Sequence, residues 1–180
     1  IRARVAEQPE HYFYPDQYNN PANPAAHELT TAPEILEQTG GAVTHFVAAL
    51  GTCGTFVGVG RHLRAVQPHV QLVAVQPDAP YHALEGVKHL ASTAMLPGIY
   101  DPTLADRTIE ISSEQAFAMA RRLARTEGLM VGISAAANVA ASLKVAYELK
   151  QGVVVTILCD SAAKYLQASF WQEGQAGDGI

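Results

Sequence analysis

Short apolar runs typical of β-strands alternate with helix-like segments along most of this chain, and this alternation restricts the fold more than any other feature. The strand-like runs lie at 43–50, 70–75, 108–111 and 153–158. Helical patterns lie around and between them at 33–39, 56–66, 112–127 and 135–149, with another over 161–172. Chains built in this way form α/β folds. The pattern therefore predicts a mainly parallel sheet flanked by helices.

Element boundaries are clearest in the helix over 112–127. Ser112 can cap its first turn, Gln115 completes a capping box, and Gly128 ends it. Residues 1–32 are rich in Pro, Asn and aromatic residues, which is turn chemistry and predicts an irregular lead-in segment. The proline-rich stretch 77–107 predicts a long loop, and such loops are usually functional or mobile. We expect one α/β domain over 33–173 and a frayed tail over 174–180.

Composition excludes several classes of function. The chain has 180 residues, a net charge of −5 and no Lys/Arg run, so nucleic acid is not an expected partner. It has no apolar stretch long enough to span a bilayer, and its scattered histidines indicate no metal site. Cys53 and Cys159 favour two reduced thiols in a cytoplasmic protein, with a redox pair as the alternative. The start at Ile1 rather than at Met indicates a domain, a fragment or a processed chain.

Loop 51–55, Gly-Thr-Cys-Gly-Thr, is the most informative because it connects a strand-like run to a helix. Ligands of parallel sheets bind beyond the carboxyl ends of the strands, which makes the loops after Leu50, Val75 and Leu158 candidates. Small residues let the backbone approach an anion, and the following helix adds partial positive charge. The loop predicts a phosphate site, with a turn that binds nothing as the alternative. Its glycine spacing matches neither a Walker loop nor a dinucleotide fingerprint.

Five segments resemble the cysteine synthase and cystathionine β-synthase family, whose cofactor is pyridoxal 5′-phosphate (PLP). They are Asn20-Pro21-Ala22-Asn23-Pro24 with His27; the 51–55 loop, with Cys53 where many members have glycine; Glu85-Gly86 with Leu96–Asp101; Ala120–Gly128 before Gly132-Ile133-Ser134; and Thr156–Ser161 before Tyr165-Leu166. The resemblance covers about residues 12–171. It implies the large, phosphate-binding domain of a fold type II PLP enzyme.

The resemblance also implies roles for individual residues. Those that would hold the cofactor phosphate are Gly51, Thr52, Cys53 (through its backbone), Gly54 and Thr55. Ser161 would hydrogen-bond the pyridine nitrogen, and Gly132 and Ser134 would line the cofactor cleft. Gln17 would lie near the substrate carboxylate. A neutral serine makes the ring a weaker electron sink than an acidic partner would, which suits β-elimination.

Local chemistry offers simpler roles for three of these residues. Ser161 could cap the helix predicted after it, and Ser134 could cap the Ala-rich helix. Gln17 sits in a polar turn and could simply be solvated. For these residues the sequence leaves both readings open.

The family's Schiff-base lysine lies in an N-terminal Ser-x-Lys context that this chain lacks. Its lysines outside that context are Lys88, Lys144, Lys150 and Lys164. We therefore expect the N-terminal lysine-bearing half to be absent, with no catalytic residue in this chain and no activity from it alone.

By resemblance, the whole enzyme would be a homodimer. It would make cysteine from O-acetylserine, or a similar activated serine, and a sulfur donor, all small molecules. The alternatives are cystathionine β-synthase or dehydratase chemistry. A further alternative, of a different class, is a non-catalytic module that binds a phosphate-bearing ligand or a partner protein.

Overall fold

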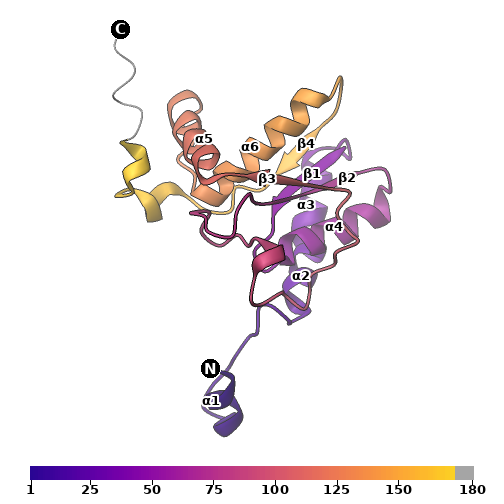
Figure 1. Cartoon of the computed structure of the whole chain (residues 1–180). Coiled ribbons are helices and arrows are strands. Elements are labelled where there is room, and N and C mark those ends of the chain that lie inside the picture. Colours follow the sequence, from indigo (N-terminus) through magenta and orange to yellow (C-terminus); the bar gives the residue numbers. More distant parts are fainter. Residues whose placement is uncertain (173–180) are drawn as a thin grey trace.

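The computed structural model of the chain describes residues 1–172 and contains the predicted parallel sheet (Figure 1). Its strands are β1 (His45–Ala49), β2 (Gln71–Pro77), β3 (Arg107–Ile111) and β4 (Val154–Thr156). They are ordered β3-β2-β1-β4, and each neighbouring pair is parallel. The expected α/β fold is therefore confirmed. Within these residues, no helix combines the length and the apolar character that crossing a membrane requires.

Helices cover both faces of the sheet (Figure 1). On one side lie α2 (Ala22–Ala26), α3 (Ala32–Gln38) and α4 (Gly54–Val66), and on the other α5 (Ser113–Thr126) and α6 (Ile133–Glu148). The short helix α1 (Arg2–Glu7) stands apart from the sheet. At the start of α5, Ser112 and Gln115 exchange side-chain to backbone hydrogen bonds, which confirms the predicted capping box.

Alternate residues of the strands supply two separate hydrophobic cores. On β1, Phe46 and Ala48 belong to the core under α3 and α4, whereas Val47 belongs to the core under α5 and α6. Strand β2 alternates in the same way. Successive side chains of a strand point to opposite faces, so a sheet covered on both sides buries nearly all of them. This burial explains why consecutive residues in the centres of β1 and β2 are apolar.

The helix expected over residues 161–172 is wrong. Two short 3₁₀ turns, Ala162–Tyr165 and Ser169–Trp171, stand there instead. The buried ring of Phe170 stacks on Phe117 of α5 with ring centroids 4.6 Å apart, and Arg121 donates to the carbonyl of Phe170. These contacts hold the segment against α5 and replace the hydrogen bonds of a regular helix.

The expectation of an irregular segment over residues 1–32 is also wrong in part. It contains α1, α2 and a π-helical turn, His27–Thr31, which joins α2 to α3. Pro24 is accommodated because the first turn of a helix needs no intrahelical N–H donor. The long loop is present, since residues 78–106 contain one short 3₁₀ turn, Leu90–Ser92. The predicted tail, 174–180, lies outside the described residues.

Helix α4 packs closely on α2 through Gly58. A Cβ atom at Gly58 would lie 2.1 Å from the carbonyl oxygen of Pro24, which cannot move without displacing the backbone. Gly60, on the same helix, meets flexible side chains instead, the nearest being Leu104 at 3.0 Å from the equivalent Cβ position. The approach of α2 to α4 therefore requires glycine at position 58 and not at position 60.

Gly58→Ala should lower the free energy of unfolding by about 1–3 kcal/mol, because the overpacking outweighs the gain in helix propensity. Gly60→Ala is the matched control: it gains the same propensity, about 1 kcal/mol, and should be neutral or stabilising. Urea unfolding measures both changes. Equal stability of the two variants would contradict the close packing described for Gly58.

Candidate functional site

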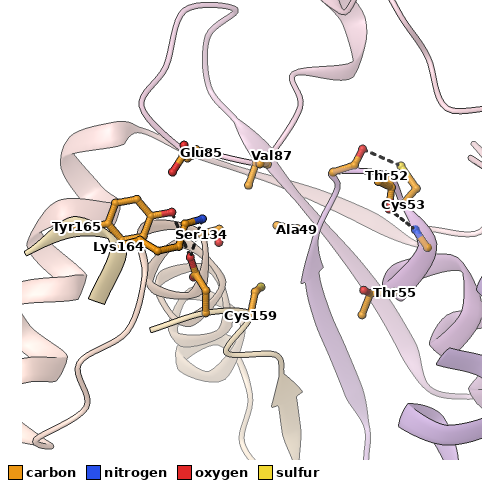
Figure 2. A pocket seen from close by; sticks show the side chains of 14 residues that line it. Ala49, Thr52, Cys53, Thr55, Glu85, Val87, Ser134, Cys159, Lys164 and Tyr165 are labelled. Carbon is orange, nitrogen blue, oxygen red and sulfur yellow. Dashed lines mark hydrogen bonds and ion pairs between the residues drawn. The ribbon is translucent and has the colours of Figure 1, made fainter. Parts of the chain in front are cut away.

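A cavity of about 370 Å³ lies at the carboxyl ends of β1 and β4, where parallel sheets bind their ligands. Four separate segments line it: Ala49, Gly51, Thr52, Cys53, Gly54 and Thr55; Glu85, Gly86 and Val87; Ser134; and Cys159, Asp160, Lys164 and Tyr165. Figure 2 shows the 51–55 loop on one side of the cavity and Glu85, Lys164 and Tyr165 across from it. The predicted loop therefore opens on a cavity and is not a sealed turn.

The 51–55 loop carries unpaired backbone donors. In the part of the chain that the structure describes, the N–H groups of Thr52, Cys53 and Thr55 donate to no acceptor. They stand at the N-terminus of α4, where the helix carries partial positive charge. The Thr52 hydroxyl accepts from Asn23 Nδ2 (3.1 Å) and from the N–H of Gly54 (3.3 Å), so its own hydrogen remains available. This arrangement suits an anion with several oxygens, such as a phosphate.

Cys53 gives the loop its shape. Its φ of +72° lies in the left-handed region, which favours glycine. The side chain is only 2% exposed and packs in the core beneath α4, and burial raises the pKa of its thiol to about 11. Cys53 therefore contributes backbone curvature and packing, and its sulfur is protonated at neutral pH.

Two glycines of the loop are required by the groups that pack on them. A Cβ atom at Gly51 would lie 2.4 Å from the carbonyl oxygen of Gly86, and one at Gly54 would lie 1.8 Å from Oδ1 of Asn23. The amide of Asn23 also donates to the carbonyl of Gln17 at 2.7 Å. The long loop and the Asn-Pro-Ala-Asn-Pro segment thus hold the 51–55 loop at two points.

The wall opposite the loop carries two carboxylates, a phenol and an amine. The Tyr165 hydroxyl donates to Oδ2 of Asp160 at 3.1 Å and lies beside Glu85. Burial, reinforced by these two carboxylates, raises the pKa of Tyr165. The Lys164 ammonium lies 4.0 Å from Oδ2 of Asp160, with 64% of its side chain exposed. Two carboxylates against one amine leave this wall negative.

Gly132 and Ser134 lie where α6 begins. Ser134 lines the cavity, as does Cys159. Because the N-cap of α6 is Gly132 and no side chain caps it, the alternative of Ser134 as a helix cap is wrong. Gly132 does not line the cavity, but a Cβ atom there would lie 2.0 Å from Oδ1 of Asp160. Gly132 therefore makes room for the Asp160 carboxylate.

Ser161 and Gln17 lie outside the residues that line the cavity. Oγ of Ser161 accepts from the N–H of Ala163 at 3.3 Å, so this serine does cap the turn that follows it. Its hydroxyl hydrogen has no acceptor among residues 1–172. The side chain of Gln17 is exposed. The cofactor role of Ser161 and the substrate role of Gln17 stay predictions.

Sequence reasoning missed Asp160 and Lys164, and it gave Tyr165 no role beyond membership of a motif. All three follow β4 at the carboxyl edge of the sheet and line the cavity. All three lie in the segment after Leu158, to which the rule for parallel sheets already pointed, so that rule applied to every side chain of the segment could have found them.

Comparison with known proteins defines the class of this chain. Residues 1–160 match a family model described as pyridoxal-phosphate dependent enzyme. The chain therefore belongs to the PLP-dependent enzymes, and its curated relatives assign it to their cysteine synthase family, as the five motifs predicted.

Cysteine synthase of Aquifex aeolicus (strain VF5) is 44% identical over 177 residues, which cover 96% of this chain and 54% of that protein. Cysteine synthase B of Escherichia coli (strain K12) is 40% identical over 164 residues, which cover 91% of this chain and 54% of that protein. The chain thus spans about half the length of the curated relatives that it matches.

Solved structures show the same fold. O-acetylserine sulfhydrylase isoform 3 from Entamoeba histolytica matches with a TM-score of 0.89 and 32% identity, covering 99% of this chain and 55% of that one. An O-ureido-L-serine synthase matches with a TM-score of 0.85 and 33% identity, covering 99% of this chain and 58% of that one. These likenesses confirm the expected fold type and PLP as the family's cofactor.

Alkylation should distinguish the two cysteines. Both are free, as expected for reduced thiols. At pH 8, iodoacetamide should reach Cys159, which is exposed, but modify it slowly, because partial desolvation of its sulfur raises the thiol pKa. Cys53 should stay unmodified, because a pKa of about 11 leaves roughly one thiol in a thousand ionised. Peptide mass spectrometry reads both sites, with urea-unfolded protein as the control in which both react. Rapid labelling of Cys53 in the folded protein would show that the loop is not buried as described.

Proposed function

We propose that this chain carries the phosphate-binding part of a PLP-dependent enzyme that makes cysteine from O-acetylserine, or a similarly activated serine, and a sulfur donor. One observation carries the proposal: the backbone N–H groups of Thr52, Cys53 and Thr55 have no acceptors within residues 1–172 and lie at the N-terminus of α4. A phosphate dianion fits these donors and the Thr52 hydroxyl without any Lys or Arg. The reaction class is supported by the names of the curated relatives, which are cysteine synthases.

The remaining cofactor contacts are assigned by resemblance. Ser161 has a hydroxyl hydrogen to donate to the pyridine nitrogen, since its oxygen accepts from Ala163. Ser134 lines the cleft, and Gly132 acts indirectly by making room for Asp160. Bound PLP supplies an electron sink. A neutral hydroxyl beside its nitrogen keeps that sink moderate, which suits loss of a leaving group from the β-carbon.

Gln17 is proposed to lie near the substrate carboxylate. Its turn is fastened to the phosphate loop through Asn23, which bonds both the Gln17 carbonyl and the Thr52 hydroxyl. This link supports a position close to the cofactor, although the glutamine side chain does not line the cavity. Substrate and phosphate would then be held by one connected set of hydrogen bonds.

The amine that binds PLP covalently is proposed to come from outside this chain. Lys164 lines the cavity but pairs with Asp160, and the Lys88 ammonium lies 4.9 Å from the ring centroid of Tyr18. Lys144 bonds the Glu110 carbonyl away from the cavity. Without that amine, the chain alone would bind the cofactor and would not turn over substrate.

The protein at its natural length should form cysteine from O-acetylserine and sulfide, as an acid-ninhydrin assay for cysteine would show. We expect kcat/KM to exceed by about tenfold or more the values for cystathionine formation from serine and homocysteine and for keto-acid formation from serine. A higher kcat/KM for either competing reaction would contradict the proposed activity and favour that chemistry instead.

Thr52→Val should weaken binding of pyridoxine 5′-phosphate about tenfold, because one hydrogen bond to a charged phosphate is lost. This ligand has no aldehyde, so its affinity does not depend on a lysine. Thr108→Val, an exposed threonine on β3, is the matched control and should leave the Kd unchanged. Isothermal titration calorimetry measures both. An unaltered Kd for Thr52→Val would argue against a phosphate in this loop.

We also propose that the protein is a cytoplasmic homodimer, by resemblance to its family. Exposed apolar side chains such as Phe13 and Leu29, which a second copy could cover, support the dimer.

A further inference from the structure

His27 lies next to the phosphate loop and contacts one of its threonines. Its Nε2 is 3.2 Å from Oγ1 of Thr55, and its Nδ1 is 3.0 Å from Oγ1 of Thr31. The π-helical turn His27–Thr31 makes the second contact, because its two ends carry the ring and the hydroxyl. π turns between α-helices often occur at functional sites. Each ring nitrogen therefore has one hydroxyl partner.

The imidazole borders a second cavity, of about 250 Å³, which shares Thr55 with the first. Burial lowers the pKa of His27, so the ring is neutral at pH 7. A neutral imidazole donates from one nitrogen and accepts at the other. The position of its single hydrogen is therefore a real choice between two tautomers.

The tautomer of His27 decides whether the hydroxyl of Thr55 can donate a hydrogen bond to a ligand. If Nε2 accepts, the hydroxyl hydrogen of Thr55 is used on the ring. If Nε2 carries the hydrogen and donates, Oγ1 of Thr55 accepts, and the threonine hydrogen is available to a phosphate. Thr31 then donates to Nδ1. Within residues 1–172, the Thr55 hydroxyl has no partner other than His27, so nothing else fixes it.

We propose that His27 is a positioning residue that donates from Nε2 to Thr55 and so aims the Thr55 hydroxyl hydrogen at a phosphate in the 51–55 loop. Thr31 holds the ring in this tautomer by donating to Nδ1. The inference rests on the proposed function, because it presumes that the loop binds a phosphate. Behind the phosphate loop, the π turn His27–Thr31 would then orient the hydroxyl of Thr55.

The test compares the affinities of pyridoxine 5′-phosphate and pyridoxine for the protein at its natural length, because their ratio isolates the phosphate contact. His27→Gln places an amide N–H near the position of Nε2 and should keep that ratio within about twofold of wild type. His27→Asn places its amide near Nδ1, and His27→Leu removes both the Nε2–H donor and the Nδ1 acceptor; each should lower the ratio about tenfold. Thr30→Val, an exposed neighbour of Thr31, is the matched control.

A second measurement needs no variant. Two-dimensional ¹H–¹⁵N NMR of the histidine side chains should show the Nε2–H tautomer for His27 when pyridoxine 5′-phosphate is bound. An Nδ1–H tautomer would overturn the proposal. So would equal losses in His27→Gln and His27→Leu, since a merely structural role would not distinguish them. If wild type itself binds pyridoxine 5′-phosphate no better than pyridoxine, the phosphate site fails, and the proposed function fails with it.

Discussion

Close backbone packing around the 51–55 loop is the constraint on which the site depends. The carbonyl of Gly86 and the amide of Asn23 stand where side chains at Gly51 and Gly54 would otherwise lie. Because these neighbours touch the loop backbone directly, the loop keeps one curvature and leaves its N–H groups unpaired. Unpaired N–H groups are costly unless water or a ligand satisfies them. Segments distant in sequence therefore keep the loop in a form that favours binding an anion.

The sequence predicted the sheet and the strand-to-helix loop at 51–55 well because both are local patterns. Strands β1 and β2 are buried on both faces, so consecutive residues of each, Phe46–Ala49 and Leu72–Val75, are apolar. The loop is a short glycine-rich connection from strand to helix, and its fit to a phosphate rests on backbone geometry. The capping box of Ser112 and Gln115 is equally local. Where one stretch of chain contains all the interacting groups, its sequence pattern is sufficient to predict the local structure.

The errors and omissions share the opposite cause. The 3₁₀ turns near Phe170 depend on stacking with Phe117, which lies far away in the sequence. Helix α2 and the π turn after it depend on α4, whose Gly58 lets α2 approach. The sequence did not predict Asp160 as a cavity residue, because the position of its carboxylate depends on the space left by Gly132 and on the hydrogen bond from Tyr165. Tertiary contacts decided each of these features, and residue propensities alone do not reveal them.

The two ends of the cavity differ in charge. At one end, N–H groups and the α4 terminus attract an anion, whereas Glu85 and Asp160 at the other end repel one. Lys164 offsets only part of that negative charge, because it is mostly exposed and lies 4.0 Å from Asp160. A ligand with one phosphate is therefore favoured in a single orientation, with its phosphate on the loop. The acidic end then faces the remainder of the ligand, where a second anionic group would be disfavoured. The ligand's orientation thus follows from the opposite charges of the two ends of the cavity. The 51–55 loop therefore needs no lysine or arginine to attract the phosphate.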